Sequence, residues 1–315
     1  MGIEALREER LKQADYLEKQ RIDPYPGAIP LRSHANKDVV DKFEQLKGRE
    51  ISVLGRITGI RAHGKRYFFD LEDESGKVQG TITVDSVGEQ MFEIFQKGFG
   101  IGDFAGITGK VLKTKAGEVT VEASKFSMLA KALLPPPPKW EGLKDVQTRS
   151  RQRYLDLMMN KEVRERFKFR SKMVQSMRER FLELECWEVQ TPILDTTYGG
   201  ASAQPFITHH NALGIDLYLR ISNELYLKRM MVGGFEGVFE FSTDFRNEGM
   251  DATHNPEFTQ VELYKAYTDY GWMMRMSEHL IEDIAKKHLG KTEIEYVGKK
   301  LDLRTPWRRL SIYDG

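Results

Sequence analysis

Ionisable and aromatic side chains occupy alternate positions in two stretches of the C-terminal half, residues 237–248 and 256–264. Alternation of polar and apolar residues is typical of β-strands, because successive side chains point to opposite faces. The pattern therefore predicts two strands that each carry polar side chains on one face. The residues expected on these faces are Arg246 and Glu248 in the first strand, and Phe258, Glu262 and Tyr264 in the second.

A surface of this composition could bind a ligand that is both charged and planar. The guanidinium of Arg246 offers a planar fork that matches a carboxylate or a phosphate, and the ring of Phe258 offers a stacking face. Glu262 and Tyr264 offer acceptors for a cationic group. A strand face that simply contacts solvent would show the same alternation, so the pattern alone leaves both interpretations open.

Several elements must position these side chains. The two stretches are separated by the polar residues 249–255, so we expect a hairpin. Upstream, apolar residues at helical spacing predict a long amphipathic helix over residues 161–184, followed by an extended segment at 185–192. The apolar positions of this helix are Val163, Phe167, Val174, Met177, Phe181 and Leu184.

The N-terminal half has the pattern of a small barrel. Turn signals at residues 63–65, 74–76 and 115–117 separate short runs of strand-forming residues. A helix-like stretch at 86–97 lies between the third and fourth runs. Five short strands with one helix in this place fit a Greek-key barrel of the OB type. The strands are expected at residues 50–61, 66–73, 77–85, 104–113 and 118–129.

The boundaries of the domains follow from prolines. A leading helix is expected at residues 3–20, ended by the prolines in 23–26. Four consecutive prolines, Pro135 to Pro138, predict an extended, semi-rigid spacer. The expected division is 1–49 for the helix and leader, 50–133 for the barrel, 134–150 for the Pro-rich linker and 151–315 for the sheet domain.

The charge of the chain is balanced overall but uneven along its length. It has 48 Lys and Arg against 47 Asp and Glu, so any binding of nucleic acid must come from local patches. Residues 139–180 contain 13 Lys and Arg against 6 Asp and Glu. A solvated helix face would explain this excess, and so would a surface that faces phosphates at the hinge between domains.

Composition excludes several classes of protein. The 315 residues are 40% hydrophobic and 30% charged, which indicates a folded protein of about two domains rather than a disordered chain. Cys186 is the only cysteine, which excludes a disulfide framework and a four-thiolate zinc site. The sequence contains no run of 18 apolar residues, so no helix is expected to cross a bilayer. The first residues lack the apolar region of a secretory signal. We therefore expect a cytoplasmic protein with no membrane partner.

Four segments, in order along nearly the whole chain, resemble the class II lysyl-tRNA synthetases. Residues 245–249 (Phe-Arg-Asn-Glu-Gly) and 254–259 (His-Asn-Pro-Glu-Phe-Thr) resemble class II motif 2 in its lysine-specific form. Residues 187–192 resemble motif 1, which builds the dimer interface in that family. Two further segments, 199–211 and 224–229, resemble those that separate lysyl from aspartyl and asparaginyl enzymes. The resemblance implies an α+β fold, in which a five-stranded OB-fold anticodon-binding barrel precedes a class II antiparallel sheet with helices.

The resemblance also implies roles for individual residues. Arg246 and Glu248 would be the catalytic pair, and Arg246 would hold both the lysine carboxylate and the ATP α-phosphate. Lysine would further be bound by Gly200 and Glu224 at its α-amino group, and by Glu262 and Tyr264 at its ε-ammonium. ATP would contact Glu248, His254 and Asn255, with Phe258 stacked on adenine. In the barrel, the residues that would read the anticodon are Arg61, Phe68, Gln79 and Glu118.

The reaction implied by the family is ATP-dependent activation of lysine to lysyl-adenylate, followed by transfer to tRNA(Lys). The lysine carboxylate would attack the α-phosphorus and displace pyrophosphate, so no protein nucleophile is required. Catalysis would consist mainly of alignment and charge stabilisation, with Mg²⁺ accompanying ATP. The expected partners are tRNA(Lys), lysine, ATP and a second copy of the chain, bound through the motif 1 region.

The sequence departs from the family in three places. Gln204 stands where Lys or Arg is usual, and Asn223 stands where proline is usual. No segment resembles motif 3, so we expect an N-terminal portion whose catalytic domain is truncated and inactive alone, with no metal site of its own. A non-catalytic tRNA-binding or interaction module is an alternative, as is a ligase of aspartyl or asparaginyl specificity.

Overall fold

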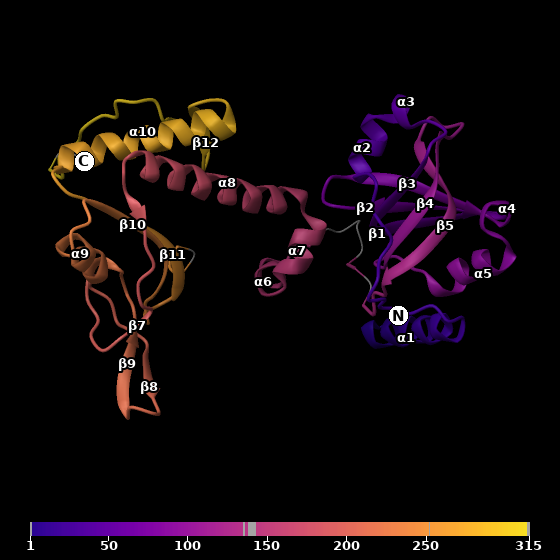
Figure 1. The fold of residues 1–315 in the computed structure, drawn as a ribbon, viewed down its shortest axis with the longest axis horizontal. Helices are drawn as coiled ribbons and strands as arrows, with labels where there is room; N and C mark the ends of the chain where they lie inside the picture. Colours follow the sequence, from indigo (N-terminus) through magenta and orange to yellow (C-terminus); the bar gives the residue numbers. More distant parts are fainter. Residues whose placement is uncertain (1, 135, 138–142, 252, 314–315) are drawn as a thin grey trace. The chain divides into compact units, whose positions relative to one another are not determined.

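The computed structural model describes residues 2–134, 136–137, 143–251 and 253–313. The chain forms two compact units, Met1–Asn160 and Lys161–Gly315 (Figure 1). Of the predicted Pro-rich linker, Pro135 and residues 138–142 lie outside the described residues.

The first unit is built on the predicted barrel. Its strands are β1 (Glu50–His63), β2 (Arg66–Glu72), β3 (Lys77–Thr83), β4 (Phe104–Lys113) and β5 (Val119–Ala130). They close in the order β1-β2-β3-β5-β4, with β3 parallel to β5 and the other neighbours antiparallel. The five predicted strands and the OB-type barrel are therefore confirmed.

Helices pack around the barrel. The predicted leading helix is α1 (Ile3–Lys19), and two short helices, α2 (Asn36–Asp41) and α3 (Phe43–Leu46), follow it. The helix expected between the third and fourth strands is divided into α4 (Val84–Val87) and α5 (Glu89–Gly98). The division occurs because Gly88 has φ 80°, a left-handed conformation that interrupts an α-helix. Two more helices, α6 (Val146–Arg151) and α7 (Arg153–Met159), complete this unit.

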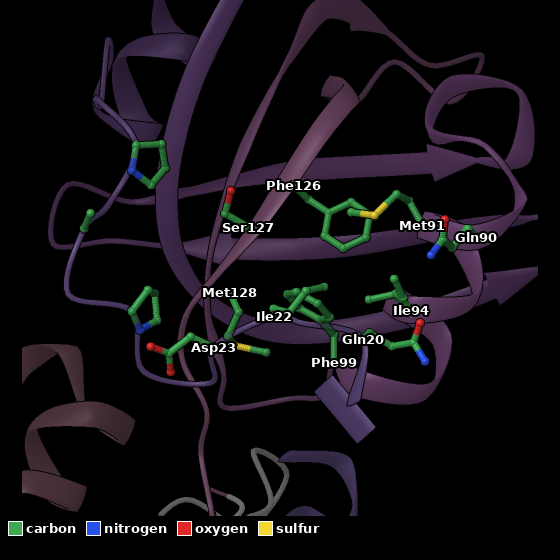
Figure 2. A pocket seen from close by; sticks show the side chains of 13 residues that line it. Gln20, Ile22, Asp23, Gln90, Met91, Ile94, Phe99, Phe126, Ser127 and Met128 are labelled. Carbon is green, nitrogen blue, oxygen red and sulfur yellow. The ribbon is translucent and has the colours of Figure 1, made fainter. Parts of the chain in front are cut away.

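A cavity of about 510 Å³ lies between the leader segment, α5 and β5. Figure 2 shows Phe99, Phe126 and Met128 among the side chains that line it. Phe126 and Phe99 are also buried core residues, whose rings meet edge to face. None of the residues predicted to bind a substrate lines this cavity.

The second unit contains the predicted long helix and hairpin. Strands β10 (Gly237–Phe245) and β11 (Glu257–Lys265) pair antiparallel, and the short β6 (Trp187–Glu188) pairs parallel with β10. Helices α8 (Lys161–Glu183) and α10 (Tyr270–Leu289) lie side by side (Figure 1). Their apolar residues bury one face of the sheet in a core around Phe181, Cys186, Phe239 and Leu280.

The second unit also contains a second small sheet, a short helix and a C-terminal hairpin. Strands β7 (Leu194–Asp195), β9 (Ile215–Leu219) and β8 (Ile207–His210) form a second small sheet in that order. Helix α9 (Glu224–Val232) contacts both β10 and β11. Strands β12 (Glu293–Tyr296) and β13 (Lys299–Asp302) form a separate hairpin. In the described parts of the chain, no helix is long and apolar enough to cross a membrane.

Candidate functional site

The register of the β10–β11 hairpin gathers polar side chains on the face opposite the core. Residues directly opposite each other in an antiparallel pair share a face. The apolar face carries Phe239, Phe241, Val261 and Leu263, all of which pack in the core. The pairs on the other face are Glu240 with Glu262, Ser242 with Gln260, Asp244 with Phe258, and Val238 with Tyr264. The predicted common face of Phe258, Glu262 and Tyr264 is thus confirmed.

The first strand is shorter than expected, and this corrects the prediction for Arg246 and Glu248. Strand β10 ends at Phe245, so strand alternation does not place these two side chains. The backbone N–H of Arg246 still donates to the carbonyl of Pro256 over 2.8 Å. Pro256 has no N–H with which to return that bond, so the ladder stops there. Glu248 instead lies beyond the strand, where its Oε1 accepts from the backbone N–H of Gln204 over 3.2 Å.

Arg246 and Phe258 lie against each other. The Arg246 Cζ is 5.0 Å from the centroid of the Phe258 ring, a cation–π arrangement. The Nε of Arg246 is buried without a hydrogen-bond partner among the described residues. The structure thus joins the predicted phosphate-binding group to the predicted stacking ring, and leaves a donor of Arg246 unsatisfied.

Glu262 is held through one of its two carboxylate oxygens. Its Oε1 accepts from the hydroxyl of Ser222 over 2.8 Å and from Nε2 of Gln260 over 2.6 Å. Within the described residues, no side chain or backbone group donates to Oε2. A carboxylate fixed in this way can present its second oxygen to a cationic ligand. Ser222 and Gln260 were not identified from the sequence.

Gly200, Ser222 and Glu224 are packed closely enough to form one site. Gly200 has φ 89°, and a Cβ at this position would lie 2.8 Å from both Cβ of Glu224 and Oγ of Ser222. The Ser222 hydroxyl accepts from the backbone N–H of Glu224 over 3.1 Å. The structure therefore brings together the predicted residues Gly200, Glu224 and Glu262 around Ser222. Glu224 also pairs with Lys228 over 2.5 Å, one helical turn further along α9.

Tyr264 lies in the same negatively charged environment. Partial burial, and then the charges of Glu224 and Glu262, raise the pKa of Tyr264 to about 12. The phenol is therefore neutral at ordinary pH and can donate a hydrogen bond. Carboxylates beside a neutral phenol favour a cationic ligand over an anionic or apolar one.

A buried ionic network, which the sequence did not predict, lies on this same face of the sheet. The guanidinium of Arg220 pairs with Glu240 over 2.8 Å and with Asp244 over 3.0 Å, and all three side chains are almost fully buried. Glu240 further accepts from the N–H and hydroxyl of Thr191 and from Nδ2 of Asn223. The sequence signal that could have indicated this network is the polar residue at every second position of 240–244.

One arginine faces two carboxylates in this network, so its formal charge is negative. Burial raises the pKa of Asp244, Arg220 opposes that effect, and the charges of Glu262 and Glu240 add to it. Oδ1 of Asn223 is buried without a hydrogen-bond partner among the described residues. The ligand-binding face thus carries buried acidic residues, Glu240 and Asp244, in addition to Glu262.

His254 and Asn255 lie on the exposed loop after Glu248. His254 Nδ1 is 2.7 Å from Oδ2 of Asp251, and Asn255 Nδ2 donates to the backbone carbonyl of Glu257 over 3.2 Å. Hydrogen bonds from the backbone of Thr253 and from His254 hold the pKa of Asp251 below its usual range. Among the described contacts, neither His254 nor Asn255 reaches Arg246, Glu248 or Phe258. The predicted ATP-binding set is therefore only partly assembled.

The predicted anticodon residues lie on neighbouring strands of the barrel. Arg61 on β1 is directly opposite Phe68 on β2. Gln79 on β3 donates to Oε2 of Glu118 over 2.8 Å and accepts from the hydroxyl of Thr120 over 2.8 Å. Gln79 and Glu118 thus contact each other, and Arg61 and Phe68 are opposite neighbours on β1 and β2.

The described residues contain no group of three or more His, Cys, Asp or Glu side chains that could hold a metal ion. His209 pairs with Asp216 over 2.8 Å on the β8–β9 hairpin.

Both units of the chain are similar to known proteins. The family profile described as tRNA synthetases class II (D, K and N) matches residues 145–315, and the profile of an OB-fold nucleic acid binding domain matches residues 51–129. The lysine–tRNA ligase of Clostridium botulinum (strain Langeland) is 48% identical over 309 residues. Those of Clostridium novyi (strain NT) and Clostridium tetani (strain Massachusetts) are each 46% identical over 310 residues. Each match covers 98% of this chain and 61% of the relative, so the chain spans less than two thirds of these ligases.

Proposed function

This chain belongs to the class II tRNA synthetases (D, K and N), and from that premise we propose that it carries the lysine site and the anticodon-binding barrel of a lysine–tRNA ligase. The activity is ATP-dependent formation of lysyl-adenylate and transfer of lysine to tRNA(Lys). The observation that carries the proposal is the fixing of Glu262 Oε1 by Ser222 and Gln260, which leaves Oε2 for the ligand.

Lysine binds by matching its two ammonium groups to carboxylates. Glu262 and Tyr264 receive the ε-ammonium, while Glu224 and the backbone near Gly200 receive the α-ammonium. Glu224 exchanges its pairing with Lys228 for the ligand, because that pair is exposed and costs little to open. A neutral side chain would leave a partly desolvated Glu262 without its cation, which disfavours other amino acids.

ATP binds beside Phe258, and Arg246 lies between the two substrates. Phe258 stacks on adenine, and Glu248, His254 and Asn255 contact the nucleotide once the exposed loop closes on it. Arg246 holds the lysine carboxylate and the α-phosphate, where negative charge accumulates as pyrophosphate leaves. Its contribution is alignment and charge stabilisation, and the attacking group is the substrate carboxylate itself.

Magnesium accompanies ATP in this family. Among the described residues, no three His, Cys, Asp or Glu side chains gather as ligands for a metal ion.

The barrel binds the anticodon of tRNA(Lys). Phe68 stacks on an unpaired base, Gln79 and Glu118 supply donors and acceptors to base edges, and Arg61 supplies a cation to the same loop. We also propose a homodimer through the segment 187–192 and a cytoplasmic location. Trp187, Ile193 and Leu194 are exposed apolar residues in or beside that segment, which supports such an interface.

The proposed domains are the leader (1–49), the barrel (50–133), the linker (134–150) and the class II domain (151–315). No segment of residues 1–315 resembles motif 3, so we propose that these residues alone do not catalyse lysine-dependent exchange of pyrophosphate into ATP. Robust exchange by the isolated chain would contradict this part of the proposal.

Calorimetric titration of the chain with lysine tests the lysine site. Norleucine is the control ligand because it has the same aliphatic chain without the ε-ammonium. We expect lysine to bind and norleucine not to bind. Equal binding of the two amino acids would overturn the assignment of Glu262. Binding of a tRNA(Lys) hairpin without binding of lysine would favour a non-catalytic RNA-binding module instead.

A further inference from the structure

A buried carboxylate lies on the outer face of the barrel, among the residues proposed to bind RNA. Asp70 is on β2, with only 3% of its surface exposed. It lies two residues from Phe68 and directly opposite Gln79 on β3. Its strand neighbours Phe69 and Leu71 are on the other face and fill the interior of the barrel. Asp70 is therefore not part of the apolar core.

Two cations from the flanking strands converge on this carboxylate. Nη1 and Nη2 of Arg61 on β1 each donate to one Asp70 oxygen over 3.2 Å, which makes a bidentate pair. Nζ of Lys77 on β3 lies 2.8 Å from Oδ2. The Asp70 side chain is 5% exposed, whereas those of Arg61 and Lys77 are 50% and 42% exposed. Asp70 thus holds the charged end of each cation, while about half of each cationic side chain remains exposed to solvent.

The backbone makes room for this arrangement at Gly59. This glycine is directly opposite Asp70 in β1, and a Cβ there would lie 2.8 Å from Asp70 Oδ2. Any side chain at this position would push the carboxylate away from the two cations. Gly59 therefore provides a second, independent way to disturb the cluster while its charges remain.

We propose that Asp70 is a positioning residue for RNA recognition, which holds Arg61 and Lys77 as a paired cation site for a backbone phosphate next to the base stacked on Phe68. The inference rests on the proposed function of the barrel, and it adds Lys77 as an RNA contact. The bidentate pair uses one N–H of each terminal nitrogen of Arg61, so the outward N–H groups remain available to a phosphate oxygen.

The sign of the charge makes this proposal testable. A carboxylate on an RNA-binding surface repels phosphates, so simple electrostatics predicts that its removal strengthens the binding of any RNA. Positioning predicts the opposite for the correct RNA loop, because Arg61 and Lys77 lose the group that orients them. Asp70→Asn removes the charge and keeps the size of the side chain.

The measurement is fluorescence anisotropy of the full chain with two labelled RNA hairpins that share a stem. One hairpin carries the tRNA(Lys) anticodon loop, and the other carries a scrambled loop. We expect D70N to weaken the binding of the anticodon hairpin by about tenfold, as for the loss of one hydrogen bond to a charged group. The scrambled hairpin should bind equally well or more tightly. Asp15→Asn, at an exposed position of α1, makes the same change of charge and should not weaken either complex.

The salt dependence of binding tests Lys77 separately. Lys77→Met should lower the slope of log K against log salt by about 0.7, as expected for one lost phosphate contact to a single strand. Lys125→Met, at an exposed position of β5, should leave the slope unchanged. Gly59→Ala should weaken the binding of the anticodon hairpin as D70N does. If D70N fails to fold, G59A and K77M together test the positioning role of Asp70.

Unchanged or tighter binding of the anticodon hairpin by D70N would overturn the inference, as would an unchanged salt slope in K77M. Failure of the wild-type chain to prefer the anticodon hairpin would instead refute the proposed function of the barrel, and the inference with it. A preference in the wild type that survives both D70N and G59A would refute the positioning role alone.

Discussion

Ser222 donates a hydrogen bond of 2.8 Å to Oε1 of Glu262, and this bond joins the segment between β9 and α9 to β11. The same hydroxyl accepts from the backbone N–H of Glu224, at the start of α9. A single small side chain therefore sets the distance between the two acidic residues proposed to bind the two ends of lysine.

Ser222→Ala should weaken the binding of lysine by about tenfold and leave the binding of ATP nearly unchanged. The variant removes one hydrogen bond to a charged group, which is worth about 1.5 kcal/mol. Titration calorimetry with each ligand measures both effects. Ser124→Ala, on the barrel, is the control and should bind lysine normally. Equal weakening of lysine and ATP would indicate general damage to the fold rather than loss of orientation at Glu262.

Glu262→Gln should weaken lysine activation far more than ATP binding, because the amide keeps the shape of the side chain but removes its negative charge. Pyrophosphate-exchange kinetics of a complete ligase carrying this substitution would measure the two effects separately. Glu257→Gln is a matched control, since Glu257 is exposed on the opposite face of β11. The role of Glu262 would be refuted by equal loss for both substrates, or by no loss at all.

Arg220→Met should lower the free energy of unfolding of the second unit by about 3–5 kcal/mol, because it leaves two buried carboxylates without their cation. Arg220→Lys should recover part of this loss, since it restores the charge but not the planar fork. Urea unfolding measures both values, with Arg275→Met at an exposed position of α10 as the control. A stable R220M variant would mean that the network contributes little to the fold.

The stability of the second unit should fall in acid partly through Glu282. Hydrogen bonds from Lys286 and Thr305 lower the pKa of Glu282 from 4.5 to about 2. The folded state therefore binds this proton less readily than the unfolded state, and the resulting stabilisation is present above pH 4.5 and disappears as the pH falls towards 2. Urea midpoints of Glu282→Gln should vary less over this range than those of the wild type. Asp283→Asn, at the exposed neighbouring position, should keep the wild-type dependence.

The elements of the fold were largely predictable, because alternation, turn signals and helical spacing are local properties. The hairpin and the five barrel strands follow from them directly. The end of β10 at Phe245 was not predicted, because it depends on the missing N–H of Pro256 in the paired strand. The division between α4 and α5 depends on the left-handed conformation of Gly88.

The candidate site was predictable only where a motif carried it. Glu262, Phe258 and Gly200 were found in this way, but Ser222 and Gln260 were not. Arg220, Thr191 and Glu240 are far apart in the sequence, and only tertiary packing reveals that they are partners. The pair of Glu224 with Lys228 is different, because its spacing of four residues in a helix was visible in advance.

Thr191 lies within the proposed dimer segment 187–192, and it is bound to Glu240 twice, through its backbone N–H and its hydroxyl. A partner subunit that changes the conformation of residues 187–190 would therefore also move Glu240, which lies on the same strand face as Glu262. Thermodynamic linkage makes such coupling reciprocal: the factor by which a second subunit tightens lysine binding equals the factor by which lysine tightens the dimer. The affinity for lysine and the stability of the dimer would then depend on each other, and Thr191 would be the residue that connects the two sites.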